Sequence, residues 1–374
     1  MLSYCLNPSC PRPENPVDMK FCQTCGTKLL LKDRYRAIKP IGQGGFGKTF
    51  LAVDEDKPSK PFCVIKQFYP QAQGTNTVQK AAELFEREAI RLDELGQHSQ
   101  IPELLAFLTQ DTQQYLVQEF IAGKDLEQEL AQNGGFNEAQ IQDVLNNMLP
   151  ILQFIHSQQV IHRDIKPENI IRRSSNQELV LVDFGAAKAI THTDLAQAGT
   201  TIGSAGYTAP EQAMGHATYS SDIYGLGVTC LHLLTELHPF DLYDAYEGEW
   251  IWRKHLKATL SDDLGQILDK MLASVASQRY TSATEVLQAL NASQSNVDSE
   301  LETLQSQFSS ASPPPPVTSS YNVDAELQKL ESKFVEQPKP AATPPKPTSD
   351  VDSELEQIQA KFQSSSQKKK PSQS

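Results

Sequence analysis

Glycine residues crowd one short segment of the chain, Gly42-Gln-Gly44-Gly45-Phe46-Gly47. Because glycine carries no side chain, the backbone amides of such a loop can approach phosphate oxygens closely. Residues 48–53 read as a β-strand instead of opening a helix, which favours a hairpin over phosphates and argues against a dinucleotide-binding turn. Further on, the strand-like run Cys63-Val-Ile-Lys66 ends on a lysine, a residue that is normally exposed when it stands alone.

Four cysteines near the N-terminus, Cys5, Cys10, Cys22 and Cys25, have the spacing of a zinc ribbon. Four thiolates complete the tetrahedral shell of a Zn²⁺ ion and leave no position open, so the predicted metal site is structural and not catalytic. A segment of ~30 residues with almost no apolar core would hardly fold without its metal. A redox dithiol and a chance pattern are the alternatives.

Two further segments carry most of the remaining polar motifs. The first is 160–169, Val-Ile-His-Arg-Asp-Ile-Lys-Pro-Glu-Asn, and the second is 180–185, Val-Leu-Val-Asp-Phe-Gly. Together with the glycine-rich loop and Lys66, in this order and at this spacing, they make residues 33–290 resemble the eukaryotic-type protein kinase family, in its Ser/Thr branch. The resemblance implies an α+β, bilobal kinase fold, ATP as phosphate donor and Ser or Thr hydroxyls of proteins as acceptors.

Phosphoryl transfer depends mainly on holding the γ-phosphate in line with the acceptor hydroxyl and on neutralising its charge. By resemblance, Asp164 is the catalytic base that accepts or orients the hydroxyl proton, and Lys166 stabilises the transferring phosphoryl group. Asn169 and Asp183 would hold Mg²⁺, since this hard cation prefers oxygen ligands.

The resemblance also assigns a nucleotide site. Lys66 would contact the α- and β-phosphates and pair with a helix glutamate, Glu88 rather than Glu86. Gln118 stands where the family gates a deeper pocket, often with an apolar residue. For Asp125, a helix N-cap is as good an interpretation as a ribose contact. At the hinge, Glu119 and Ile121 would bind adenine through backbone groups. The full set of residues expected to contact ATP is Ile41, Gly42, Gly44, Gly47, Lys66, Glu119, Ile121 and Asp125.

Downstream residues are expected to support this site. Glu211 would form a buried ion pair with Arg279, and Asp222 would hold the backbone of the catalytic loop. Ser204 replaces the family's usual threonine and keeps its hydroxyl. Arg163, next to the catalytic aspartate, accompanies control by activation-loop phosphorylation in this family. The candidate phosphorylation sites are Thr191, Thr193, Thr200 and Thr201.

Composition sets outer limits on function. The chain has 374 residues, of which 39% are hydrophobic and 21% charged, with a formal net charge of -13. This acidic balance argues against binding to nucleic acid or to an anionic membrane. No apolar run reaches the ~20 residues that span a bilayer, and the nearest, 223–237, is predicted to be a buried helix. The N-terminus lacks a secretory leader pattern, so the protein is expected in the cytoplasm, where Cys63 and Cys230 would be reduced packing residues.

Composition also divides the chain into three parts. A cysteine- and proline-rich module occupies residues 1–32, the kinase-like domain 33–290, and a Ser-, Gln- and Pro-rich tail, predicted to be disordered, 291–374. The tail repeats one pattern with the apolar stripe of a short helix. Its three copies lie at 297–308, 323–334 and 351–362. The repeats would dock onto an unknown partner or onto the main domain, with degenerate tail sequence as the alternative.

Two rival functions stay open on the sequence alone. A pseudokinase scaffold would use the fold, the zinc module and the tail for binding only, although every residue needed for transfer is present. Alternatively, the zinc module could bind nucleic acid, but it has only a weak positive excess and few aromatic residues for stacking. A four-cysteine module followed by a kinase-like domain resembles the four-cysteine Ser/Thr kinases of cyanobacteria, which implies a role in bacterial signalling.

Overall fold

The computed structural model describes residues 2–44, 47–69, 75–96, 98–186, 188–189 and 204–293. The chain divides into two units, Met1–Gln307 and Phe308–Ser374, and all the described residues belong to the first. The tail repeats lie outside the described residues, as do four predicted phosphorylation sites, Thr191, Thr193, Thr200 and Thr201. In the part that is described, no helix is both long and apolar enough to cross a membrane.

A six-stranded antiparallel sheet dominates the first half of the fold, in the order β3-β4-β5-β6-β8-β7. Side chains alternate along a strand, so the pairing register defines two faces. Thr49, Lys66 and Leu116 are directly paired and share what we call the inner face, whereas the pair Phe50 and Ile65 lies on the outer face. The strands are β3 (Leu30–Leu31), β4 (Tyr35–Gly44), β5 (Gly47–Asp54), β6 (Phe62–Phe68), β7 (Leu104–Gln110) and β8 (Gln113–Glu119).

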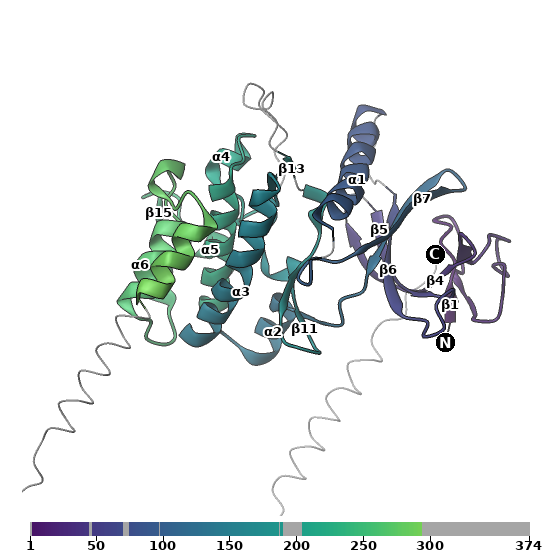
Figure 1. The fold of residues 1–374 in the computed structure, drawn as a ribbon, viewed down its shortest axis with the longest axis horizontal. Coiled ribbons are helices and arrows are strands. Elements are labelled where there is room, and N and C mark those ends of the chain that lie inside the picture. The colour runs from purple at the N-terminus through teal and green to yellow at the C-terminus, as the bar shows by residue number, and fades with distance from the viewer. Residues whose placement is uncertain are drawn as a thin grey trace, which may run out of the picture. The chain divides into compact units, whose positions relative to one another are not determined.

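Helix α1 (Thr75–Leu95) packs against the inner face, where Figure 1 shows it lying against the sheet. The ring of Phe85 on this helix lies 5.4 Å from that of Phe68 and 6.1 Å from that of Phe107, measured between centroids. Phe68 follows Lys66 by two residues and therefore projects from the same face. These aromatic contacts fix the distance between α1 and β6, the strand that carries Lys66.

The N-terminal cysteine module covers the outer face. Its hairpin, β1 (Leu2–Tyr4) and β2 (Glu14–Pro16), lies beside β4 (Figure 1). The Tyr4 ring packs 5.5 Å from that of Phe50, and Leu6 is buried in the core cluster of the outer face. Strand β3, which falls within the predicted module 1–32, pairs with β4 in the main sheet. The module and the sheet therefore share one apolar core.

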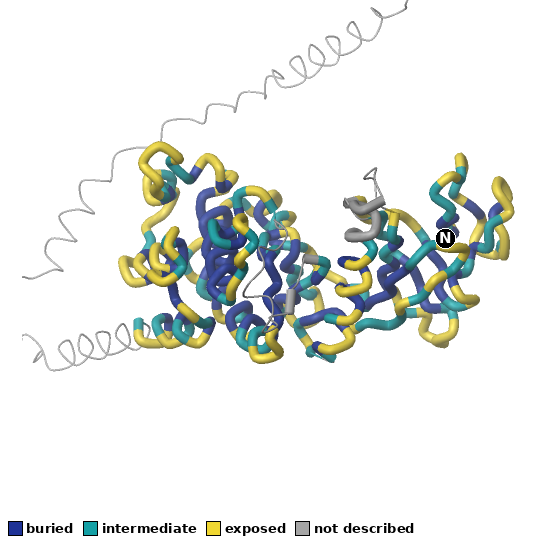
Figure 2. The backbone as a smooth tube through the Cα atoms, turned by 90° about the horizontal axis from the view of Figure 1, so that it is seen from above, coloured by how far each residue is buried: buried dark blue, intermediate teal, exposed yellow. Residues whose placement is uncertain are grey.

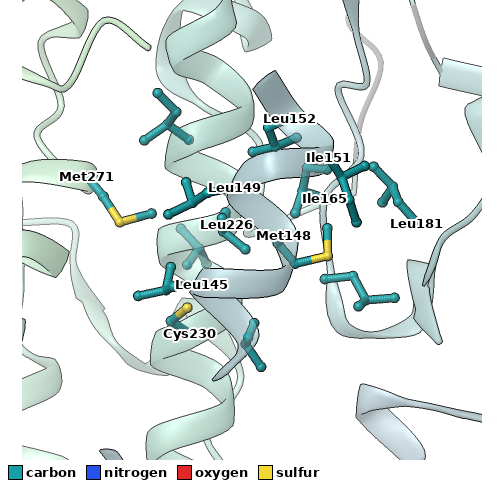
Figure 3. Close-up of a cluster of buried hydrophobic side chains, with 14 of the residues drawn as sticks. Leu145, Met148, Leu149, Ile151, Leu152, Ile165, Leu181, Leu226, Cys230 and Met271 are labelled. Carbon is teal, nitrogen blue, oxygen red and sulfur yellow. The ribbon is translucent and has the colours of Figure 1, made fainter. Parts of the chain in front are cut away.

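The second half of the described fold is mainly helical, which agrees with the predicted α+β class. Its helices are α2 (Leu126–Asn133), α3 (Glu138–Ser157), α4 (Pro210–Ala213), α5 (Tyr219–Thr235) and α6 (Asp262–Met271), with a further helical stretch over 283–293. Figure 3 shows Leu145 and Leu149 of α3 packed against Leu226 and Cys230 of α5. Helix α5 is buried along almost its whole length, seen as dark blue in Figure 2, which confirms the buried helix predicted at 223–237.

Short strands connect this helical core to the polar motifs. Strand β10 (Val160–Ile161) leads to Asp164 and pairs with β13 (Lys188–Ala189), while β11 and β12 pair beside β9 in a three-stranded sheet. Because β11 begins directly after Asn169 and β12 ends just before Asp183, the two residues emerge at the same end of this hairpin. The strands are β9 (Gly123–Asp125), β11 (Ile170–Arg173), β12 (Leu179–Leu181), β14 (Tyr243–Asp244) and β15 (Glu249–Trp250).

Candidate active site

Lys66 lies at the centre of a charged cluster on the inner face. Its Nζ forms an ion pair with Glu88 Oε1 of α1 and lies 3.1 Å from Asp183 Oδ1. Burial disfavours the lysine's charge, but the carboxylates of Asp183 and Glu88 outweigh it and raise the pKa of the ammonium group. The same ammonium group lowers the pKa of Asp183. Lys66 therefore stays cationic, as a phosphate-binding group must.

The structure selects Glu88 over Glu86 as the partner of Lys66. The side chain of Glu88 is only 5% exposed and faces the sheet, whereas Glu86, half a turn earlier on α1, is exposed. Residues two apart on a helix point to different sides, so one of these glutamates alone can reach the inner face. The ion pair expected from the sequence is thus present. The residues next to Lys66 in the sequence gave no indication that its side chain would be largely buried.

The glycine-rich segment forms the predicted hairpin between β4 and β5. Gly44 pairs with Gly47 at its tip, and Gly42 pairs with Thr49. A Cβ at Gly47 would stand 1.8 Å from the carbonyl oxygen of Gln67, so this position admits only glycine unless the strands separate. The hairpin consequently lies close to β6 at the strand end that carries Lys66. Gly45 and Phe46 are outside the described residues.

Asp164 is held in a polar constellation with the other predicted catalytic residues. Its Oδ1 accepts a hydrogen bond from the Ser204 backbone N–H at 2.8 Å, and its Oδ2 accepts one from Asn169 Nδ2 at 2.9 Å. Lys166 Nζ lies 3.4 Å from Asp164 Oδ2 and donates to Ser204 Oγ at 2.6 Å. The Asp164 carboxylate and the Ser204 hydroxyl are thus both brought within contact distance of the Lys166 ammonium group.

Asp222, on buried helix α5, fixes the backbone that leads to Asp164. Its carboxylate accepts hydrogen bonds from the backbone N–H groups of His162 at 2.9 Å and Arg163 at 2.8 Å, as predicted. Arg163 has a φ of +70°, a strained conformation that these bonds help to hold. His156 Nε2, which the sequence gave no reason to single out, lies 2.9 Å from the same carboxylate.

The segment that would receive a base lies where β8 ends. Glu119 donates its backbone N–H to Glu103 O at 2.9 Å, and its side chain accepts from Arg173 Nη1 at 2.7 Å. Ile121 is buried and Ile41 is 46% exposed. These contacts anchor the chain at residue 119, so its backbone position is defined before any ligand binds.

Asp125 serves as a helix N-cap. Its Oδ1 accepts a hydrogen bond from the backbone N–H of Gln128 at 2.8 Å, at the start of α2. This was one of two interpretations of the residue from the sequence. One carboxylate oxygen makes the cap, and a ribose contact would have to use the same group.

Glu211 and Arg279 form the predicted buried ion pair. The guanidinium of Arg279 bonds both carboxylate oxygens at 2.7 Å, and its side chain is fully buried. Ser221 Oγ, near the start of α5, donates to Glu211 Oε1 at 2.7 Å. The pair joins the segment after Ser204 to the helical core and has a structural role.

The four N-terminal cysteines converge in space, with all Sγ atoms within 4.8 Å of one another. Cys5 Sγ lies 3.5 Å from Cys25 Sγ, and Cys10 Sγ lies 3.6 Å from Cys22 Sγ. A tetrahedron with Zn–S bonds of ~2.3 Å has S···S edges of about 3.8 Å, so the donor set fits Zn²⁺. Although burial opposes it, backbone amides and Asn15 lower the pKa of Cys22 to about 6, whereas burial raises the pKa of Cys5 and of Cys10, so the fit to Zn²⁺ rests on the positions of the four sulfur atoms.

The contacts between the cysteine module and the sheet were not anticipated from the sequence. The buried Gln67, on β6, donates from Nε2 to Leu6 O at 2.7 Å. The buried Arg36 on β4 donates to Ser3 Oγ at 3.2 Å and to Met19 O at 3.0 Å. The only sign of these contacts in the sequence is a polar residue, such as Gln67, inside an otherwise apolar strand. The partner atoms are mostly backbone carbonyl oxygens, which every residue has, so the sequence does not identify them.

Comparison with known proteins gives a consistent result. Residues 35–290 match the family model described as the protein kinase domain. The chain is 46% identical over 298 residues to serine/threonine-protein kinase B of Synechocystis sp., covering 77% of this chain and 52% of that protein. It is 42% identical over 268 residues to serine/threonine-protein kinase PknA of Nostoc sp., covering 70% and 47%. The chain spans about half the length of these curated relatives.

Proposed function

The chain belongs to the eukaryotic-type protein kinase family, among its Ser/Thr kinases, and we propose that it transfers the γ-phosphate of ATP to Ser or Thr hydroxyls of proteins in bacterial signalling. The observation that carries this proposal is the polar site itself. Lys66, Glu88 and Asp183 form one charged cluster, and Asp164 lies in a second with Lys166. A scaffold without catalysis would not need both clusters intact.

The two clusters divide the chemistry between them. Lys66 would bind the α- and β-phosphates beneath the hairpin that contains Gly42, Gly44 and Gly47. Asp164 would accept the proton of the acceptor hydroxyl, and Lys166, which already donates to Ser204 Oγ, would stabilise the charge that develops on the transferring group. The short contacts between Asp164, Lys166 and Ser204 hold these groups in place before substrate binds.

Asn169 and Asp183 would hold Mg²⁺, which would offset the negative charge of the phosphates. The residues fit this role. The amide nitrogen of Asn169 donates to Asp164, to its backbone oxygen at 2.8 Å and to Oδ2, and this orientation leaves the carboxamide oxygen as the ligand. Asp183 is kept ionised by Lys66, so it offers a carboxylate at neutral pH.

We further propose that phosphorylation of the activation segment regulates the enzyme. Arg163 is 8% exposed, and burial, together with neighbouring Arg87, lowers the pKa of its guanidinium to about 10, although Asp222 opposes the shift. A new phosphate nearby would offset the repulsion between the two arginines. The candidate acceptors are Thr191, Thr193, Thr200 and Thr201.

The flanking parts receive separate roles. We propose that Cys5, Cys10, Cys22 and Cys25 bind a structural Zn²⁺ in the module 1–32, and that the repeats in the tail 291–374 dock onto a partner. All six cysteines are free thiols in the structure, which fits a reducing compartment such as the cytoplasm. The resemblance to cyanobacterial four-cysteine kinases supports the zinc assignment.

The test is Mg²⁺-dependent transfer of labelled γ-phosphate to the protein itself and to a generic basic protein substrate. The native chain should yield phosphoserine or phosphothreonine, and Asp183→Ala should abolish the signal because it removes a proposed metal ligand. Asp93→Ala, an exposed position on α1, is the matched control and should behave like the native chain. Label incorporated equally by native and Asp183→Ala chains would refute the proposal.

A further inference from the structure

Gln118 is a buried polar residue for which the fold supplies no partner. It is 5% exposed, and its carboxamide oxygen Oε1 has no hydrogen-bond partner among the residues that the structure describes. Because an unpaired buried acceptor loses its hydration without compensation, it destabilises the folded state. A buried acceptor without a partner therefore needs a physical explanation, and one such explanation is that a bound ligand donates to it.

The position of Gln118 separates it from the other unpaired polar atoms. Within the described residues, four more buried side-chain atoms lack a partner, in Tyr35, Gln67, Glu127 and Trp250. Tyr35 belongs to the core cluster of the outer face, and Gln67 bonds to the cysteine module there. Glu127 lies in α2 and Trp250 in β15, both in the helical half. Among these five residues, Gln118 is the one on the inner face.

The register of β8 places Gln118 between the two ends of the proposed nucleotide site. Gln118 pairs with Val64 on β6, and Leu116 pairs with Lys66, so Gln118 and Lys66 project from the same face about 7 Å apart along the strands. Gln118 also directly precedes Glu119, whose backbone is proposed to bind the base. A nucleotide with its phosphates at Lys66 and its base at Glu119 would therefore lie next to the Gln118 side chain.

We propose that Gln118 recognises the adenine base, with Oε1 accepting a hydrogen bond from its exocyclic amine. The inference rests on the proposed function, because it requires ATP in this site. That amine carries two hydrogens, and one backbone carbonyl at the hinge can accept only one of them well. The direct cross-strand neighbours of Gln118, Val64 and Leu104, have no acceptor on their side chains. Gln118 would accept the second hydrogen and so contribute to selection of adenine.

The experiment measures dissociation constants for ATP and for purine riboside triphosphate, which lacks the amine. In the native full chain, ATP should bind more tightly than this analogue. Gln118→Met, of similar volume, should reduce the preference about fivefold, the effect of one neutral hydrogen bond. Gln114→Met is the matched control, because Gln114 lies on the same strand and face but four residues farther from the hinge, and it should leave the preference unchanged.

Stability without nucleotide gives an independent readout. Since Oε1 is unpaired, Gln118→Met should melt at or above the temperature of the native chain. A marked fall in melting temperature, or failure to fold, would mean that the carboxamide is satisfied within the fold and would overturn the inference. An unchanged preference for ATP in a folded Gln118→Met would do so as well. Absence of ATP binding by the native chain would overturn the proposed function together with the inference.

Discussion

The two faces of the six-stranded sheet carry polar residues with different surroundings. On the outer face, the amide nitrogen of Gln67 donates to Leu6 O of the cysteine module at 2.7 Å. On the inner face, Lys66 is held between two carboxylates, and the acceptor of Gln118 has no partner among the described residues. Adjacent residues of one strand, Lys66 and Gln67, thus serve different purposes.

The difference shows how one strand can be both framework and active site. On the outer face, the Gln67 amide nitrogen bonds to a part of the chain that is always present, so this bond contributes to stability, while Gln67 Oε1 and the Tyr35 hydroxyl have no partner among the described residues. In our proposal, inner-face groups keep charge or hydrogen-bonding capacity available for a nucleotide, which lowers stability but preorganises binding. Changes on the outer face should therefore appear mainly in stability and metal content, and changes on the inner face mainly in nucleotide binding and turnover.

The largest effect is expected from breaking the metal site over the outer face. Cys22→Ser removes one of four thiolates, and structural zinc sites of this kind contribute on the order of 10 kcal/mol of binding free energy. Zinc content per chain, measured by metal analysis after gel filtration, should fall from one ion to none. Cys230→Ala, a buried cysteine of α5, is the control and should keep its zinc. Retention of zinc by Cys22→Ser would contradict the assignment.

The next effect concerns the charged cluster of the inner face. Glu88→Gln preserves shape but removes the charge that positions Lys66, and loss of one preorganised electrostatic group lowers turnover by about 100- to 1000-fold. The rate of γ-phosphate transfer at saturating ATP and Mg²⁺ measures it. Glu86→Gln, on the exposed side of α1, should keep the native rate. Equal transfer rates for Glu88→Gln and Glu86→Gln would contradict the role of the inner-face ion pair in turnover.

A smaller effect is expected where Gln67 joins the module to the sheet. Gln67→Leu removes the donor to Leu6 O and should lower the free energy of unfolding by about 1 kcal/mol, measured by denaturant titration. For comparison, Gln110 accepts from the Lys32 backbone N–H at 2.8 Å in an exposed position. Gln110→Ala should change stability by less than about 0.5 kcal/mol. If both variants lose the same stability, burial does not distinguish these contacts.

The smallest effect is a change in acid sensitivity at the edge of the outer face. Arg34 binds Asp54 at 2.7 and 2.9 Å and, against the opposing effect of burial, lowers the pKa of Asp54. A carboxyl with a lowered folded-state pKa stabilises the fold above its unfolded pKa, near 4, and this contribution disappears as the pH falls through the folded value.

Asp54→Asn should therefore flatten the decline in melting temperature between about pH 5 and pH 2. Asp56→Asn is its control, since the side chain of Asp56 is 65% exposed and lies 3.9 Å from Arg34. A decline in Asp54→Asn as steep as in the native chain would show that this ion pair does not contribute to acid sensitivity.

Motif residues were predictable because their chemistry demands particular side chains at fixed spacings. The glycine hairpin, the partner of Lys66 and the carboxylate of Asp222 all lie where the sequence placed them. The buried helix at 223–237 was predictable for a different reason, since an apolar run of that length has few other stable environments. The α+β class was implied by the resemblance to the protein kinase family.

Long-range packing was not predictable in the same way. The cysteine module covers the sheet through backbone carbonyls of Leu6 and Met19, which leave no trace in a sequence. The unpaired acceptor of Gln118 depends on the register of three strands, β6, β7 and β8, and alternation within one strand cannot reveal it. His156 reaches Asp222 only because α3 and α5 pack together.

The most direct test of the account separates binding from chemistry at Asp164. Asp164→Asn keeps the size of the side chain but removes the proposed proton acceptor. The dissociation constant for ATP should stay within about twofold of the native value, while single-turnover phosphate transfer should fall by about 100- to 10,000-fold. Native transfer rates in Asp164→Asn, with ATP bound normally, would contradict the claim that the proposed active site performs the phosphoryl transfer through the Asp164 carboxylate.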